Sequence, residues 1–216
     1  MDIKNFSSKI FPDKHIALVG NSDKILLKKH GKFIDTHDFI IRINTAPIKG
    51  YEEYVGSRTN LRFISQLTFK EELTFYPCEK NYIKKIKNSS FFLVSEEEEK
   101  KIRKIRDLYI HPSNKLYIFH NKFSHKLRFL VASKYNIFKK LYYYRYINPF
   151  STGMTALSFL CLLKRKVSLF GFNKSKSQNR YNHYFGRIGK IKTNHNFDAE
   201  NKLLKYFLSN YEINYY

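Results

Sequence analysis

The chain has 216 residues, a length that predicts one large domain, residues 1–216, rather than two small ones. Hydrophobic residues make up 43% and charged residues 27%, which excludes a wholly disordered chain. The formal net charge is +22, so the surface should attract an anionic partner. Nucleic acid, an anionic membrane and a substrate that carries phosphate or carboxylate all meet that description.

The cysteines and the apolar runs indicate the compartment. Cys78 and Cys161 form no C-x-x-C pair, so the sequence predicts neither a disulfide framework nor a zinc site. Residues 1–10 hold no apolar run typical of a signal peptide, and the strongest apolar stretch, residues 157–163, is far below the ~18 residues that span a bilayer. We therefore expect a reduced, cytoplasmic protein without a membrane span.

Short apolar segments alternate with helical patterns along the chain. His15–Gly20 is an apolar run closed by glycine, and a turn and a helical pattern at residues 25–29 follow it. A helix at residues 154–163 and a closing helix at residues 197–211 are also expected. Further strands are predicted at residues 39–43, 62–65, 91–94, 116–120 and 167–172. This order implies right-handed crossovers, so we expect a single Rossmann-like α/β domain with a mostly parallel central sheet flanked by helices.

Two turns are candidate ligand sites. Gly20-Asn21-Ser22 follows the first buried strand and offers backbone N–H groups and an amide side chain. Ser151-Thr152-Gly153 opens an apolar helix with two hydroxyls and unpaired N–H groups, which suit an anion or a ribose. Taken alone, the first motif is explained by an ordinary turn and the second by an ordinary N-cap. Neither a dinucleotide fingerprint nor a P-loop is present.

The candidate acid–base residues lie near the C-terminus. His183 and His195 stand in a polar stretch, and histidine exchanges protons near neutral pH or donates to phosphate. Glu200 lies five residues after His195, where a carboxylate orients an imidazole or favours the start of a helix.

Four segments together resemble the motifs of one enzyme family. Residues 15–59, from His15-Ile-Ala-Leu-Val-Gly-Asn-Ser to Val55-Gly-Ser-Arg-Thr59, resemble the long sialylmotif of the family 29 glycosyltransferases, the eukaryotic-type sialyltransferases. Residues 151–172 are similar to the short sialylmotif, His183-Tyr-Phe to motif III, and His195-x-x-x-x-Glu200 to the very short motif. The four occur in the family's order, in what looks like a short bacterial-like member.

The resemblance implies a GT-A-like fold variant and a sialyltransferase that uses CMP-sialic acid. His195 would be the general base, with Glu200 as its structural support, and His183 would bind the leaving phosphate. The resemblance also implies that other motif residues contact the CMP-sugar donor. These are Asn21, Ser22, Asn44, Ser151, Thr152, Gly153 and Tyr184. Transfer would invert the anomeric carbon, with no metal ligands and no cofactor besides the CMP-sugar.

Two alternatives stay open at this point. A transferase that uses CMP-Kdo on a lipopolysaccharide-type acceptor fits the same motifs, because Kdo shares the carboxylate and the nucleotide. A nucleic-acid-binding protein fits the charge and the 37 Phe and Tyr residues, but no basic recognition motif supports it, so we expect no nucleic-acid partner.

The sequence also departs from the family pattern. The two cysteines that family members usually join are replaced by Ile16 and Lys164, which agrees with a cytoplasmic protein. The acceptor is expected to be a glycan or a glycolipid. For a glycolipid, the basic segments at residues 80–87 and 122–140 would give a peripheral contact with the inner, anionic face of the membrane.

Overall fold

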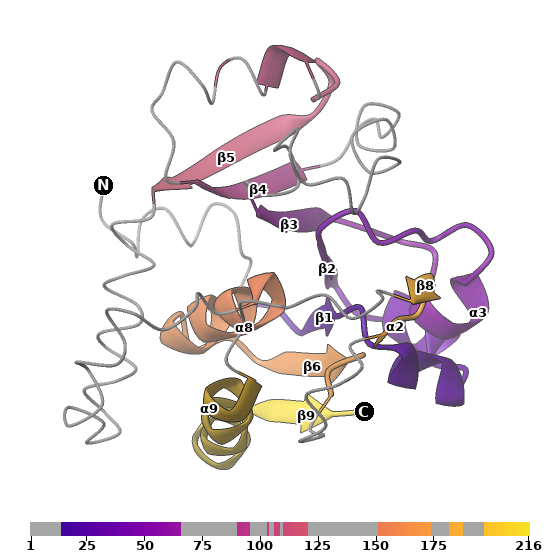
Figure 1. Cartoon of the computed structure of the whole chain (residues 1–216), viewed down its shortest axis with the longest axis vertical. Helices are drawn as coiled ribbons and strands as arrows, with labels where there is room; N and C mark the ends of the chain where they lie inside the picture. Colours follow the sequence, from indigo (N-terminus) through magenta and orange to yellow (C-terminus); the bar gives the residue numbers. More distant parts are fainter. Residues whose placement is uncertain are drawn as a thin grey trace.

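The computed structural model describes residues 14–65, 90–95, 103, 106–108, 110–120, 151–173, 182–187 and 197–216. Seven of the described strands form one sheet in the order β5-β4-β3-β2-β1-β6-β9, and all of its pairings are parallel (Figure 1). The strands are β1 (Ile16–Val19), β2 (Phe39–Ile43), β3 (Leu61–Ser65), β4 (Ser90–Ser95), β5 (Lys115–His120), β6 (Val167–Phe170) and β9 (Ile213–Tyr215).

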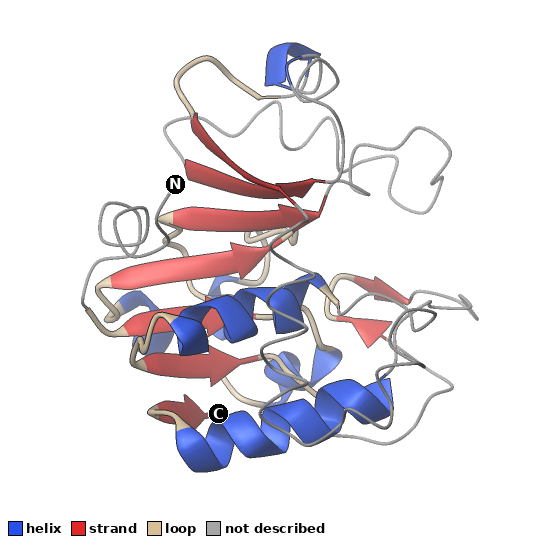
Figure 2. Ribbon diagram, turned by 90° about the vertical axis from the view of Figure 1, so that its left-hand side faces the viewer, coloured by secondary structure: helices blue, strands red, loops and turns tan. Residues whose placement is uncertain are grey.

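Helices cover both faces of the sheet. Alternate residues of β1 point to opposite faces: Ile16 and Leu18 pack with α8 (Thr152–Leu162) and α9 (Phe197–Asn210). Ala17 and Val19 pack with residues of the 3₁₀ helix η1 (Asp23–Leu27), α2 (Gly31–Asp35) and α3 (Glu52–Val55) on the other face. Figure 2 shows the two long helices crossing in front of the strands. Strands buried on both faces explain the near-continuous apolar runs in the sequence.

The strand order reverses at one point of the sheet. From β1 the chain proceeds outward through β2, β3, β4 and β5, and it then returns to place β6 on the other side of β1. In open parallel sheets, ligands bind beyond the carboxyl ends of the strands at such a reversal. The reversal here lies between β1 and β6, and the small hairpin of β7 (Asn182–His183) and β8 (Gly186–Arg187) lies beyond the arrowheads of the sheet in Figure 2.

The predicted α/β fold is confirmed, with local corrections. The helix expected at residues 154–163 is α8, Thr152–Leu162. The helix expected at residues 25–29 is the 3₁₀ helix η1, which begins two residues earlier. The strand expected to reach residue 172 ends at Phe170, because Gly171 adopts a φ of +63°. The chain after α9 adds the edge strand β9, which was not predicted, because three residues give too little pattern.

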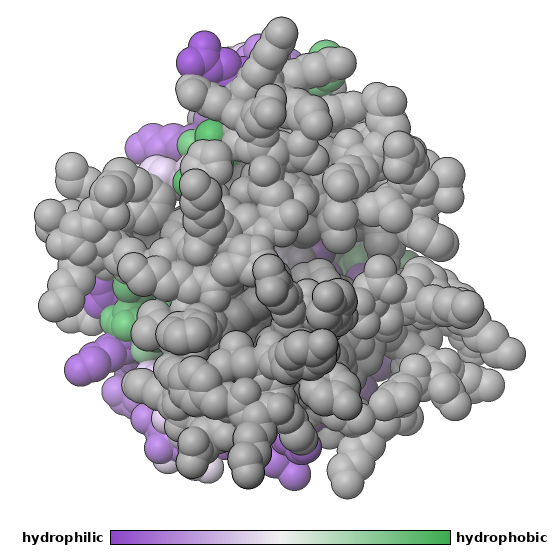
Figure 3. Space-filling view, turned by 60° about the vertical axis from the view of Figure 1, so that its left-hand side comes forward, coloured by the Kyte–Doolittle hydropathy of each residue, from purple (hydrophilic) through white to green (hydrophobic). Residues whose placement is uncertain are grey.

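The described surface and helices add two observations. The described atoms visible in Figure 3 are mostly hydrophilic, with hydrophobic atoms in small groups. Within the described ranges, no helix is both long enough and apolar enough to cross a membrane. Cys78 and the two basic segments at residues 80–87 and 122–140 lie outside the described residues.

Candidate active site

Glycines bring the turns after β1 and β6 into contact with the start of α8. A Cβ on Gly20 would lie 2.6 Å from the carbonyl oxygen of Gly171, and one on Gly153 would lie 3.2 Å from the ring of Phe172. The Ser22 N–H donates to the Gly171 carbonyl at 3.0 Å. Larger residues at Gly20 or Gly153 would therefore separate the turns, so the two motifs converge because their backbones can approach closely.

Two buried polar atoms lie just beyond the carboxyl ends of β1 and β2. Asn21 is 7% exposed; its Nδ2 donates to the Ile43 carbonyl at 3.4 Å. Asn21 Oδ1 and the hydroxyl of Thr45 are buried, and neither has a hydrogen-bond partner among the described residues. Leaving a buried polar atom without a partner costs about 1–3 kcal/mol. The carboxyl ends of β1 and β2 thus hold polar groups that a polar ligand would satisfy.

The hairpin β7–β8 is fixed against the same turns. His183 forms an isolated antiparallel bridge with Ser22, and the Tyr184 N–H donates to the Asn21 carbonyl at 3.0 Å. The Tyr184 hydroxyl donates to the Pro47 carbonyl, and its ring packs edge-on against Tyr51. Tyr184 is therefore a buried link between motif III and the β2–α3 loop. Its predicted contact with the donor stays a prediction.

His183 lies half-buried at this position. Burial lowers the pKa of His183 from its ordinary 6.5 to about 4. The imidazole is thus neutral at pH 7 before a ligand binds. A phosphate beside it would raise the pKa again, because a nearby negative charge favours the imidazolium.

We expect this histidine to make the fold less stable in acid. The pKa is lower in the folded chain, so its stabilising contribution is complete above pH 6.5 and is lost as the pH falls from 6.5 towards 4. Each unit of pKa difference corresponds to about 1.4 kcal/mol. Thermal unfolding of the wild type and of His183→Gln between pH 7.5 and 4.5 measures this loss of stability.

Comparing the wild type with the variant cancels the contributions of the other histidines, because both proteins retain them. His15 and His30 also have pKa values lowered first by burial, and their effects cancel in the difference between the two proteins. The wild-type melting temperature should fall more steeply than that of the variant. Parallel pH profiles would contradict the lowered pKa of His183 in the folded chain.

Ser151 connects the short motif to the very short motif. Glu200 is 9% exposed; its carboxylate accepts hydrogen bonds from the Ser151 N–H and, at 2.9 Å, from the Ser151 hydroxyl. The Ser151 Oγ also accepts from the Met154 N–H at 3.3 Å and so caps α8. The N–H groups of Thr152 and Gly153 have no partner within the helix. They are the donors of this motif that Glu200 does not occupy.

Glu200 should therefore stabilise both the fold and the start of α8. Glu200→Ala leaves the half-buried Ser151 N–H and hydroxyl without their acceptor, so we expect a loss of about 1–3 kcal/mol in the free energy of unfolding. Denaturant unfolding measures the loss. Transfer activity, assayed well below both melting temperatures, should fall as well, because Ser151 begins the helix.

Asp35 offers a matched control for that variant. Its carboxylate accepts from the N–H and the hydroxyl of Ser57, the same pair of donors, in the α3–β3 region. Asp35→Ala should lower stability and leave transfer near the wild-type rate. Equal losses of activity in the two variants would contradict a specific role for Glu200 at α8.

The remaining predicted site residues are placed as follows. Ser22 is buried, and its Oγ caps η1 by accepting from the Lys24 N–H at 3.3 Å. Asn44 follows β2 with a left-handed φ of +50°. His195 lies outside the described residues, so its role as base and its support by Glu200 stay predictions. Within the described part of the chain, no group of three His, Cys, Asp or Glu side chains is arranged to hold a metal ion.

Sequence reasoning missed the groups that hold the site together. Gly171 and Phe172 were assigned to a strand, and Thr45 was given no role in the site. Arg42 and Arg62 were noted only as strand residues, yet both are at most 2% exposed. A charged residue inside an otherwise apolar strand was the available signal, because such a charge is buried only with partners.

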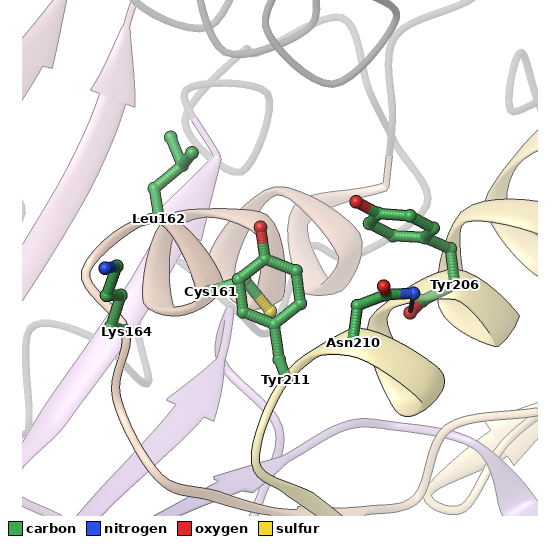
Figure 4. Close-up of a pocket in the computed structure, with 6 residues that line it drawn as sticks. All are labelled: Cys161, Leu162, Lys164, Tyr206, Asn210 and Tyr211. Atoms are coloured by element: carbon green, nitrogen blue, oxygen red, sulfur yellow. Dashed lines mark hydrogen bonds between the residues drawn. The ribbon is translucent and has the colours of Figure 1, made fainter. Parts of the chain in front are cut away.

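A separate hollow lies at the other end of α8 (Figure 4). It has a volume of about 360 Å³ and lies between the C-terminal ends of α8 and α9. Its lining residues are Cys161, Leu162, Lys164, Tyr206, Asn210 and Tyr211. Cys161 lies ten residue steps after Ser151 along α8, a rise of about 15 Å, so this hollow is distinct from the motif cluster.

Comparison with known proteins identifies related chains. A CMP-N-acetylneuraminate-beta-galactosamide-alpha-2,3-sialyltransferase of Gallus gallus is 27% identical over 186 residues, covering 81% of this chain and 48% of the chicken protein. A beta-1,6-galactosyltransferase of Arabidopsis thaliana is 37% identical over 67 residues, covering 30% of this chain and 17% of that protein. The chain thus spans about half the length of the chicken relative.

A solved structure and a family model give the fold and the family of this chain. A crystal structure of a mammalian sialyltransferase matches with a TM-score of 0.64 and 23% identity, over 94% of this chain and 68% of that chain. This likeness supports the fold. The family model for glycosyltransferase family 29 (sialyltransferase) matches residues 12–211. The chain therefore belongs to glycosyltransferase family 29.

Proposed function

We propose that this protein transfers sialic acid from CMP-sialic acid to a hydroxyl of a glycan. The observation that carries the proposal is the convergence of three motifs at the reversal of strand order. Asn21, Gly153 and His183 come from distant parts of the sequence, and contacts among Gly20, Phe172, Ser22 and Tyr184 bring their segments together.

The chemistry of the cluster suits a nucleotide monophosphate. The buried Asn21 Oδ1 can accept from a hydroxyl or amino group, and the Thr45 hydroxyl can donate or accept. The N–H groups of Thr152 and Gly153, at the positive end of the α8 dipole, suit a phosphate or a sugar carboxylate. The neutral His183 can donate one N–H to the leaving phosphate.

Transfer then requires one displacement at the anomeric carbon. His195 takes the proton of the acceptor hydroxyl, and the acceptor oxygen forms the new bond as the bond to the CMP phosphate breaks. The electron pair of that bond leaves with CMP. The configuration inverts because the acceptor attacks from the side opposite the leaving group. His183 and the start of α8 would stabilise the charge that develops on the phosphate.

The donor is the part of the proposal that needs the sharpest test. A family relative is named a beta-1,6-galactosyltransferase, so membership alone does not fix the donor. CMP-sialic acid, CMP-Kdo and UDP-galactose should be assayed in parallel with a galactose-terminated oligosaccharide, following release of the nucleotide.

We expect CMP-sialic acid to be used best and EDTA to leave the rate unchanged. Preferential use of UDP-galactose would overturn the proposed donor, and use of CMP-Kdo alone would change the sugar but keep the nucleotide. Loss of activity in EDTA, restored by a divalent cation, would overturn metal independence. Cytoplasmic location and membrane contact stay predictions.

A further inference from the structure

Arg62 binds the turn that carries Asn44. Its guanidinium lies on β3 and is 2% exposed, and a charge buried to that extent requires hydrogen-bond partners. Nη1 donates to the Asn44 carbonyl at 3.0 Å and to the Ala46 carbonyl at 3.1 Å. Arg62 therefore joins the two ends of the short turn that follows β2.

Strand β3 also binds the N–H group of Asn44. The Asn44 N–H donates to the Phe63 carbonyl at 2.9 Å, so β3 contacts Asn44 through both of its peptide groups. Asn44 has a φ of +50°, a region that non-glycine residues seldom adopt and that asparagine tolerates best. The direction of the Asn44 side chain depends on that conformation, and Thr45, with its buried hydroxyl, lies inside the same turn.

Arg42 is a neighbouring arginine that is buried to a similar extent but binds a different loop. It pairs with Arg62 in the β2–β3 register and is 1% exposed. Its guanidinium donates to the carbonyls of Gly56 and Arg58 and to the hydroxyl of Thr59, all in the α3–β3 loop. The two arginines thus differ in the loop that they hold rather than in their burial or strand position.

We propose that Arg62 is a positioning residue for the nucleotide site, which it serves by holding Asn44 in its left-handed conformation at the start of the Asn44–Ala46 turn. The inference rests on the proposed function, because Asn44 must contact the nucleotide. Arg62 acts through this turn and touches no reacting atom. Loss of its hydrogen bonds should weaken donor binding more than it slows the chemical step.

The test compares Arg62→Met and Arg62→Lys with Arg42→Met and Arg42→Lys. Titration calorimetry gives the Kd of CMP, steady-state kinetics give KM for CMP-sialic acid and kcat, and thermal unfolding gives the melting temperature. We expect Arg62→Met to raise Kd and KM at least tenfold with kcat within about threefold of wild type. Arg62→Lys should restore part of the affinity, because an ammonium can still donate to one of the carbonyls. The Arg42 variants should lose stability with Kd within about twofold of wild type.

A double variant keeps the inference testable if the Met variants do not fold. Arg62→Lys added to Asn44→Ala should raise Kd no more than about twofold beyond Asn44→Ala alone, because the two residues act through one contact. Multiplicative effects, or equal losses of CMP affinity in the Arg42 and Arg62 variants, would overturn the inference. If Asn44→Ala weakens CMP binding and the Arg62 variants do not, this inference is overturned and the proposed function stands. Unchanged affinity in Asn44→Ala would overturn the proposed role of Asn44 and this inference with it.

Discussion

Replacing His195 by alanine is expected to slow transfer by about 10²–10⁴-fold, because that is the usual contribution of a general base. The affinity for CMP should stay within a few-fold of wild type, because the base acts on the acceptor hydroxyl and not on the nucleotide. Single-turnover rates with CMP-sialic acid, together with calorimetry of CMP, measure the two quantities separately.

His111 provides a control at another position. It lies before β5, and its Nδ1 interacts with the hydroxyl of Ser113. His111→Ala should leave the rate near wild type. Transfer by His195→Ala at the wild-type rate would remove His195 from the role of base, and the remaining candidate would then be His183.

Replacing Asn21 by alanine is expected to weaken CMP binding by about 1–3 kcal/mol, or roughly 5–150-fold. Asn21 is buried, its Oδ1 has no partner within the described residues, and the variant removes the acceptor that we assign to the nucleotide. The free fold should lose little, because the amide makes one long hydrogen bond of 3.4 Å to Ile43. Calorimetry of CMP and thermal unfolding of the unliganded protein check both parts.

Asn60 is the matched control for Asn21. Its Oδ1 accepts from the Ile40 N–H at 2.8 Å, at the amino end of β3. Asn60→Ala should lower the melting temperature and leave the Kd of CMP unchanged. If both asparagine variants bind CMP as the wild type does, the nucleotide does not lie at the carboxyl end of β1.

The predictable part of the fold is the part with local signals. Apolar runs such as residues 39–43 gave β2 with its observed bounds, because a strand buried on both faces leaves a continuous pattern. Ser151 before an apolar segment indicated an N-cap, and Ser151 does cap α8, which begins two residues before the predicted helix. The motifs also indicated Asn21 and His183 as site residues, and the structure brings their segments together.

The remaining features depend on contacts between distant residues. The bond from Tyr184 to the Pro47 carbonyl and the bonds from Ser151 to Glu200 join segments that carry no mutual signal in one sequence. The role of Arg62 depends on the register of β2 and β3, which places it beside the turn after β2. Periodicity cannot supply such pairings, since each depends on how the whole sheet assembles.

The most direct test of the account is a thermal-shift comparison of CMP, CDP, UDP and GDP. A ligand that binds only the folded chain, at 100 times its Kd, stabilises it by about 2.7 kcal/mol, which for a chain of this size corresponds to about 5–11 °C. We predict a rise of that order with CMP, a smaller one with UDP and GDP at the same concentration, and loss of the CMP effect in Asn21→Ala. A larger shift with UDP or GDP than with CMP, or no shift with any of them at millimolar concentration, would contradict a CMP-sugar site at the carboxyl ends of β1 and β6.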